Sequence, residues 1–320
     1  MSIAVDPAEA ERVLQAALAG LRRLCISAAI DKSHGTTHAK RVLAHVERAL
    51  LEANPRLSLP RELSVRLAAL LHDADDRKYF PNKPIGRYPN AQRLLHEAGA
   101  SESVAADTLQ MISLVSCSAN GNSAPEVAKD EPELLWPRWA DRLEATGAIG
   151  VVRCYQYNSV MGAPLSVAST PRPTSEDEAW ALATPERFES YQSSGGGSAS
   201  MIDHYFDKLL QISRPPPELV QNAYLESAAA QRAAPLLFVL LEFGRTGTVP
   251  VEHIESIAEE IANNPIKGTG ENVLKSKKLP EEEYCEATDD DETLATETQT
   301  ITPPFASEGM LAQNIHIHMH

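Results

Sequence analysis

The apolar residues of this chain recur mainly at the spacing of amphipathic helices. Leu14, Leu18, Leu21 and Cys25 lie three to four residues apart, so they share one face of a helix. Almost no segment alternates apolar and polar residues, which is the pattern of a half-buried strand. The chain is therefore predicted to be all-α. We expect helices over residues 8–30, 37–53, 60–72, 90–98, 101–114, 139–156, 201–212, 217–243 and 251–263.

Stretches without this periodicity divide the chain. Residues 158–200 have few periodic signals and end in SSGGGSAS, which predicts a long loop with a flexible tip. From residue 264 onward Gly, Lys, Glu, Asp and Thr dominate, a composition typical of disorder. The sequence thus predicts one domain over residues 1–245, a short helix within 246–265 and a disordered acidic tail over 266–320.

Composition narrows the class of partner. Hydrophobic residues make up 43% of the chain, enough for a sizeable core, and the low aromatic content of 5% favours helices. The formal net charge of −15 argues against nucleic-acid binding, which needs Lys and Arg to neutralise phosphates. The acidic run Glu281–Glu297 is most simply a solvated tail.

The cysteines and the N-terminus indicate the compartment. Cys25, Cys117, Cys154 and Cys285 are far apart and form no CxxC pair, which favours a reducing environment. The first residues carry acids where a signal peptide would carry basic residues. The longest apolar segment, 233–241, contains a proline and is far shorter than the roughly 20 residues that span a bilayer. We expect a cytoplasmic protein with no membrane partner.

Three segments predicted to be helical carry candidate metal ligands: His38, the pair His72 and Asp73, and Asp141. Imidazole and carboxylate ligands suit Mn, Fe, Co, Mg and Zn. Four such ligands on a six-coordinate ion leave positions for water and a phosphate oxygen.

The order of these motifs resembles a known family. A first histidine with Arg41-Val42 after it, then His-Asp, then Asp, is similar to the HD-domain metal-dependent phosphohydrolases. The run DRLEATGAIGVVR over Asp141–Arg153 and the run DHYFDKLLQI over Asp203–Ile212 resemble its YpgQ/YedJ-type subgroup, nucleoside triphosphate pyrophosphohydrolases. The resemblance extends from about Arg22 to Phe243.

The resemblance implies a function and a set of site residues. It implies that His38, His72, Asp73 and Asp141 bind a divalent metal, with Mn expected and Mg, Co, Fe, Ni or Zn as alternatives. It implies that a nucleoside or deoxynucleoside triphosphate is hydrolysed to monophosphate and pyrophosphate. Beside the metal we expect the catalytic residues Asp76, Lys78 and His34 and the substrate-binding residues Arg77, Arg142, Arg153 and Lys208.

Each of these residues also has a structural interpretation. Asp76 and Lys78 can form a loop salt bridge, and His34 can belong to the start of a helix. Arg153 and Lys208 can be surface charges, and Arg142 can pair with a structural carboxylate. His45 is interpreted as a core histidine, because it shares the face of His38. The alternating terminal histidines, His316, His318 and His320, can bind transition metals but lie at the chain end.

Two rival functions stay open. The same metal centre serves a phosphomonoesterase or phosphodiesterase, and a non-catalytic HD module would sense a nucleotide and use the acidic tail to dock a partner. In each case we expect the small-molecule ligand to be a nucleotide. The sequence is compatible with a homodimer and leaves base and sugar preference open.

Overall fold

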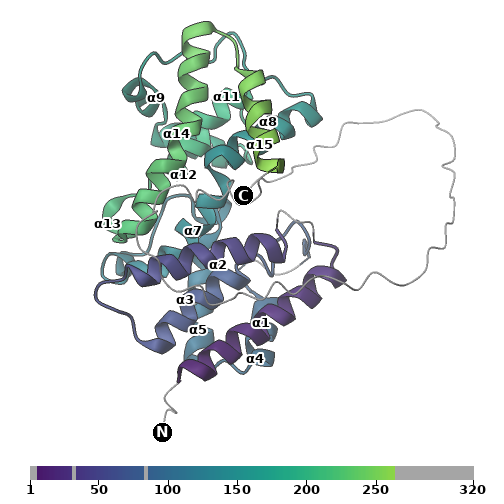
Figure 1. The fold of residues 1–320 in the computed structure, drawn as a ribbon, viewed down its shortest axis with the longest axis vertical. Helices are drawn as coiled ribbons and strands as arrows, with labels where there is room; N and C mark the ends of the chain where they lie inside the picture. The colour runs from purple at the N-terminus through teal and green to yellow at the C-terminus, as the bar shows by residue number, and fades with distance from the viewer. Residues whose placement is uncertain (1–5, 31–33, 83–85, 264–320) are drawn as a thin grey trace, which may run out of the picture. The chain divides into compact units, whose positions relative to one another are not determined.

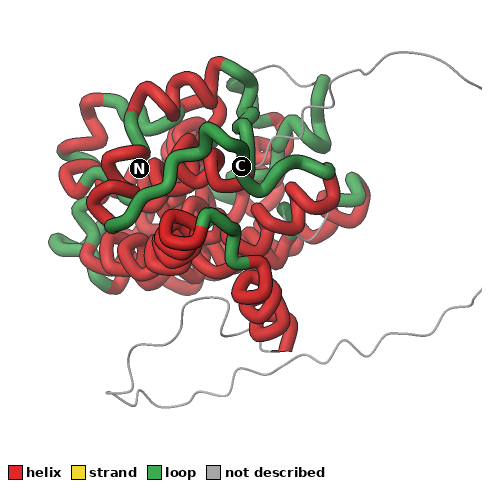
Figure 2. Tube along the Cα trace, turned by 90° about the horizontal axis from the view of Figure 1, so that it is seen from above, coloured by secondary structure: helices red, strands yellow, loops and turns green. Residues whose placement is uncertain are grey.

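The computed structural model describes residues 6–30, 34–82 and 86–263 of the 320-residue chain. All regular secondary structure in these ranges is helical, which confirms the predicted all-α fold (Figure 2). The chain divides into two units, and the described residues all belong to the first. The predicted acidic tail, Cys285 and the terminal histidines lie outside the described residues.

A first group of helices surrounds α3 (Leu59–Leu71). Residues 67–71, in which all five side chains are apolar, are buried because α3 contacts neighbouring helices on several sides. Its neighbours are α1 (Pro7–Ser27), α2 (Thr36–Leu51), α5 (Glu102–Val115) and α7 (Trp136–Ala145), while α4 (Pro89–Ala98) packs on α1 (Figure 1). Between α5 and α7 lie the short α6 (Cys117–Asn120), η1 (Glu126–Lys129) and η2 (Pro132–Leu135).

A second group packs around the long helix α14 (Ala223–Thr246), which follows the short α13 (Pro217–Val220). Leu225 and Ala229 near its start belong to the first core, and its later apolar residues belong to the second. Helix α14 therefore joins the two cores (Figure 1). The second group also contains α8 (Gly147–Met161), α11 (Met201–His204), the π-helical turn η3 (Tyr205–Leu209), α12 (Leu210–Ser213) and α15 (Val251–Asn263).

Two of the predicted helices are each split at a residue with a left-handed backbone. The expected helix 139–156 is split into α7 and α8 at Gly147, where φ is +74°, a left-handed backbone that glycine adopts readily. The expected helix 217–243 is split into α13 and α14 at Gln221, where φ is +44°. Tertiary packing sustains these turns, so helical periodicity alone did not reveal them.

The expectation of a long loop over residues 158–200 is wrong. This stretch contains α9 (Glu176–Leu182) and α10 (Pro185–Ser193), which bury Ala179, Phe188 and Tyr191. Ser175 and Thr184 cap the two helices by accepting hydrogen bonds from backbone amides three residues on. Helices of two turns are too short to show a repeat, which is why the pattern missed them.

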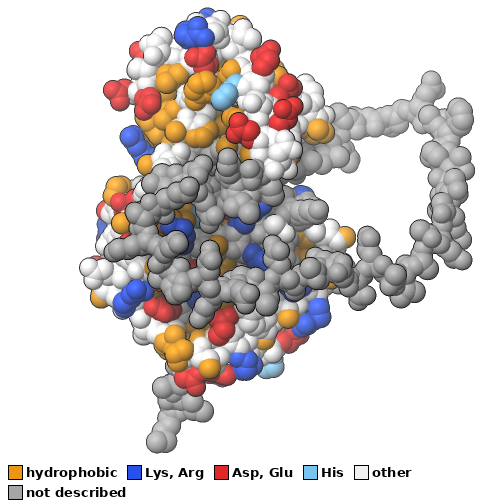
Figure 3. All heavy atoms as spheres, in the orientation of Figure 1, with side chains coloured by type: hydrophobic (Ala, Val, Ile, Leu, Met, Phe, Trp, Pro, Cys, Tyr) orange, Lys and Arg blue, Asp and Glu red, His pale blue; other side chains and the backbone are white. Residues whose placement is uncertain are grey.

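The surface of the second group carries an apolar pocket. Pro235, Phe238 and Ile257 line it, and His253 lies over Phe238 with ring centroids 4.3 Å apart. Hydrophobic side chains gather around a histidine on this face (Figure 3). Among the described helices, none combines the length and apolar character needed to cross a bilayer. Cys25, Cys117 and Cys154 are buried free thiols.

Candidate metal centre

Three packed helices bring the four predicted ligands together. His38 lies in the first turn of α2, and Asp141 lies in the middle of α7. His72 directly follows α3 with helical backbone angles, and Asp73 begins the turn after it. Because α2, α3 and α7 all contact one another, residues that are far apart in the sequence face one point.

The side-chain atoms of these four residues lie close enough together to bind one metal ion. The Nε2 atom of His38 is 3.2 Å from Nε2 of His72 and 3.1 Å from Oδ1 of Asp141. Oδ2 of Asp73 is 3.6 Å from Nε2 of His38 and 3.4 Å from Nε2 of His72. His38, His72 and Asp73 together can hold a metal ion, and Asp141 completes a set of two imidazoles and two carboxylates.

A backbone carbonyl orients His72. Its Nδ1 lies 2.9 Å from the carbonyl oxygen of Ala69, which can only accept a hydrogen bond, so Nδ1 donates. Nε2 then faces the cluster, and once it has given up its own proton its lone pair is available to a metal ion. Metal-binding histidines are commonly held in this way by a partner on the other ring nitrogen.

The charges in the cluster favour ionised acids. Burial by itself raises the pKa of Asp73, but the charge and hydrogen bond of His72 outweigh it and lower that pKa to about 2. Burial likewise opposes ionisation of Asp141, yet hydrogen bonds from His38 and His72 hold its pKa well below the usual range. Burial lowers the pKa of His72, and the two carboxylates reverse this and raise it well above the usual value. Both acids are thus in the form that binds a cation.

His34 and Asp76, two of the predicted catalytic residues, lie beside this cluster. Nε2 of His34 is 3.8 Å from Oδ2 of Asp76, and both side chains are buried. The third predicted residue, Lys78, donates its backbone amide to Oδ1 of Asp76, while its ammonium lies 5.1 Å from the ring of Tyr79. The side chains of Lys78 and its neighbour Arg77 are exposed.

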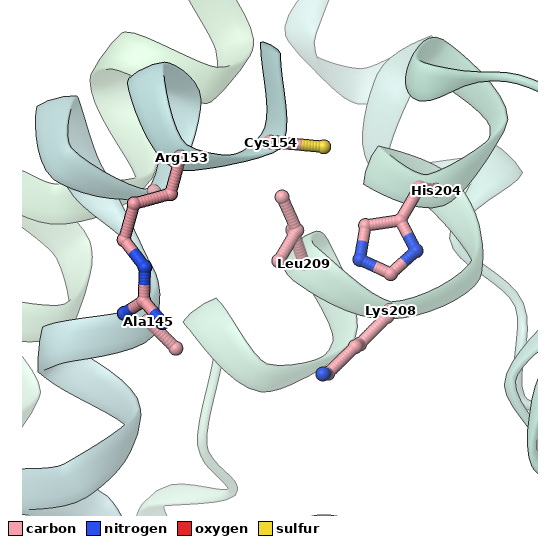
Figure 4. Close-up of a pocket in the computed structure, with 7 residues that line it drawn as sticks. Ala145, Arg153, Cys154, His204, Lys208 and Leu209 are labelled. Atoms are coloured by element: carbon pink, nitrogen blue, oxygen red, sulfur yellow. The ribbon is translucent and has the colours of Figure 1, made fainter. Parts of the chain in front are cut away.

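Two of the predicted substrate-binding residues line one pocket. Arg153 of α8 and Lys208 of η3 border a cavity of about 20 Å³ together with Cys154, His204 and Leu209 (Figure 4). Lys208 is 2% exposed, so it is not the surface charge that its structural interpretation predicted. Burial lowers the pKa of Lys208, and the nearby charge of Asp141 acts in the opposite direction. The pocket is therefore within electrostatic range of the metal cluster.

Arg142 has a structural role. It is buried, and its guanidinium donates to the carbonyl of Gly121 and to Oδ1 of Asn122 at 2.7 Å. Its charge also lies 4.8 Å from the ring of Trp139. These contacts favour the structural alternative for this residue, although its partners are a backbone carbonyl and an amide in place of a carboxylate.

Sequence reasoning missed a buried network next to the cluster. His45 is hydrogen-bonded to Tyr224 at 2.5 Å and to Glu144 at 3.1 Å, as expected for a core histidine. Arg232 of α14 lies 3.4 Å from Glu144 and donates to the carbonyl of Leu143. Glu144 follows Asp141 by one helical turn, which is a weak signal, and nothing in the sequence indicated Arg232.

Fold and site together define an all-α protein with a buried His/Asp cluster that can hold a metal ion. The chain is 36% identical over 222 residues to an uncharacterized protein of Acanthamoeba polyphaga mimivirus, L803, a match that covers 66% of this chain and 88% of the viral protein. The chain belongs to the same family as that protein. No family model matches. A crystal structure of a Lactobacillus plantarum protein is similar, with a TM-score of 0.47 and 19% identity, over 75% of this chain and 96% of that one.

Proposed function

We propose that this protein is a metal-dependent phosphohydrolase that acts on nucleotides. The observation that carries the proposal is the convergence of two imidazoles and two carboxylates from three helices and the turn after one of them, with each imidazole nitrogen 3.1–3.6 Å from the other imidazole and from both carboxylates. Burying this many ionisable groups is unfavourable unless they are paired or bind a metal. The resemblance to HD-domain phosphohydrolases supports the same conclusion.

The donor set fits a divalent cation of the Mn, Fe, Co or Zn type, and Mn is the proposed ion. Such an ion would polarise a phosphoryl oxygen and stabilise the negative charge of the transition state. The residues that would hold it are His38, His72, Asp73 and Asp141.

The proposed substrate is a nucleoside or deoxynucleoside triphosphate. Lys208 and Arg153 place two cationic side chains at the adjoining cavity, and we propose them as contacts of the phosphate chain, for which this small cavity would have to widen. In the proposed reaction a water oxygen bonds to the α-phosphorus and gives up a proton to the solvent, the bond to the bridging oxygen breaks, and pyrophosphate leaves. The nucleoside monophosphate is the second product, and Lys208 and Arg153 are the proposed cationic contacts of the departing pyrophosphate.

Product analysis tests the proposal. The full chain is incubated with a panel of nucleotides and with Mn²⁺, Mg²⁺, Co²⁺ and Ni²⁺, and the products are separated. We expect pyrophosphate release, and a loss of at least about a hundredfold in kcat/KM in His72→Ala and Asp73→Ala. His96→Ala and Asp130→Asn are matched controls, since both side chains are exposed, and they should keep full activity.

Other products would point elsewhere. Orthophosphate release alone would indicate a phosphomonoesterase that uses the same centre. Nucleotide binding without product under all four metals would indicate a sensing module and would contradict the proposed hydrolysis.

A further inference from the structure

Asp76 carries a buried oxygen that lacks a hydrogen-bond partner. Its side chain is 4% exposed, and Oδ1 accepts the backbone amide of Lys78 at 2.9 Å. Oδ2 is buried and accepts no hydrogen bond. The imidazole of His34 is 3.8 Å away, which is too far for a hydrogen bond. A buried carboxylate oxygen in this situation is unfavourable unless a cation binds it.

The surroundings of this oxygen have the character of a ligand set. His34, whose side chain is 9% exposed, Asp73 and Asp76 each offer a ligand atom, and these atoms lie within 4.8 Å of one another. The group contains one imidazole and two carboxylates. This is the ligand chemistry of Mn²⁺, Fe²⁺ or Mg²⁺.

Asp73 belongs to both groups of ligands. Its Oδ2 faces His38 and His72 of the first centre. A carboxylate has two oxygens and can therefore bind one cation with each. The same residue can join a cation held by His38, His72 and Asp141 to another held by His34 and Asp76.

We propose that the protein binds a second divalent cation through His34 and Asp76, with Asp73 as the shared ligand of both ions. The proposal rests on the metal centre of the proposed function, because Asp73 belongs to that centre. It gives His34 and Asp76 a ligating role in place of the catalytic role that we expected from the sequence. Two cations about 3.5–4 Å apart can stabilise the attacking and leaving oxygens of a phosphoryl transfer at the same time.

The second ion should bind more weakly than the first. The first centre has four protein ligands and the second has three, one of them shared with an ion of the same charge. A titration with Mn²⁺ should therefore show two successive binding steps.

Mn²⁺ titration followed by equilibrium dialysis and electron paramagnetic resonance tests the site. The full chain is used with His316, His318 and His320 replaced by alanine, because that tract can itself bind metal. We expect two Mn²⁺ per chain, with the six-line signal of an isolated ion at low loading and a spin-coupled, broadened signal at saturation. Asp76→Asn should bind one Mn²⁺ and keep the six-line signal at saturation.

The variants are chosen so that a folding defect does not decide the result. Asp76→Asn retains an oxygen for the amide of Lys78, and His34→Ala alters a different segment and should give the same loss of one ion. His96→Ala and Asp130→Asn, which change exposed side chains, should still bind two.

The second site and the proposed function fail in different ways. If the chain with intact His34 and Asp76 binds one Mn²⁺ at saturation, with an uncoupled signal, the second site is overturned and the first centre is left intact. Two ions retained in both Asp76→Asn and His34→Ala would also overturn it. A chain that binds no divalent cation overturns the second site and the proposed hydrolysis together.

Discussion

Single buried charges set the chemistry of this protein at the residue scale. Lys208 is enclosed by the second core and faces the pocket beside the metal cluster. Burial lowers the pKa of its ammonium, so the folded protein bears a penalty for keeping this side chain charged. Such a penalty is expected for a buried lysine whose charge is used to bind a negatively charged ligand.

Replacing Lys208 by methionine separates these two effects. Lys208→Met keeps an unbranched side chain and removes the charge, so we expect kcat/KM for a nucleoside triphosphate to fall by about tenfold or more. Loss of the buried charge favours the folded state and loss of the contacts of Lys208 opposes it, so the free energy of unfolding should change little. Steady-state kinetics and urea unfolding measure the two effects, with the exposed Lys129→Met as control. Unchanged kinetics would contradict a role in substrate binding.

His204, on the same pocket, should make stability depend on pH. Burial and the charge of Lys208 lower its pKa to about 3, so the ring is neutral in the folded protein. The unfolded chain takes up this proton near pH 6.5. This contribution to stability is therefore complete above pH 6.5 and is lost as the pH falls toward 3, by up to about 5 kcal/mol from this group.

His204→Asn tests this dependence. Between pH 6.5 and pH 4 the unfolding free energy of the variant should fall less steeply than that of the wild type. Urea unfolding at a series of pH values gives the comparison, and the difference between the two proteins isolates this residue from other histidines. Parallel curves would show that His204 titrates normally.

At the scale of elements, the segment between α8 and α9 is held against α14. Arg172 donates to the carbonyl of Gly244 through Nε at 3.1 Å and Nη2 at 2.9 Å. A Cβ atom at position 244 would overlap the backbone of Pro173. This close approach of two backbones requires glycine, and it fixes the segment that precedes α9 and α10.

Gly244→Ala should loosen this attachment. Because the clash is with backbone, the segment must shift, and we expect a loss of about 1–3 kcal/mol in unfolding free energy. Thermal unfolding and limited proteolysis within residues 163–175 are the measurements. Gly197→Ala is the matched control, since a Cβ there meets nothing within 4 Å and its stability should be unchanged.

A buried polar network joins helices α2, α7 and α14. His45 of α2, Glu144 of α7 and Arg232 of α14 are hydrogen-bonded to one another. Helices α2 and α7 carry His38 and Asp141, so the network supports the relative placement of two ligand-bearing helices. Its hydrogen bonds are directional, which apolar packing is not.

At the scale of the described domain, a bound cation would connect α2, α3 and α7. A ligand that binds only the folded state stabilises it by about 2.7 kcal/mol at a concentration a hundred times its Kd. For a domain of this size this corresponds to a rise in Tm of about 5–10 °C.

Chelation should therefore lower the Tm of the full chain, and added Mn²⁺ should restore it. Differential scanning calorimetry with and without EDTA makes the measurement, and His72→Ala, which lacks a ligand, should show no response. A wild-type Tm that is indifferent to both EDTA and Mn²⁺ would count against the metal centre.

The sequence by itself determined the all-α fold, most helix boundaries and the segments that carry His38, His72, Asp73 and Asp141. These features are local or follow from ordered motifs, because helical periodicity and short ligand motifs are written within a few turns of chain. Helices α9 and α10 were missed because two turns give too few repeats.

Only the tertiary structure decided which distant groups meet. It buried Lys208, paired Arg142 with backbone and amide acceptors, and placed Arg232 beside Glu144. It also left one oxygen of Asp76 without a hydrogen bond. Each of these facts depends on contacts between segments far apart in the chain, and no local pattern encodes such contacts.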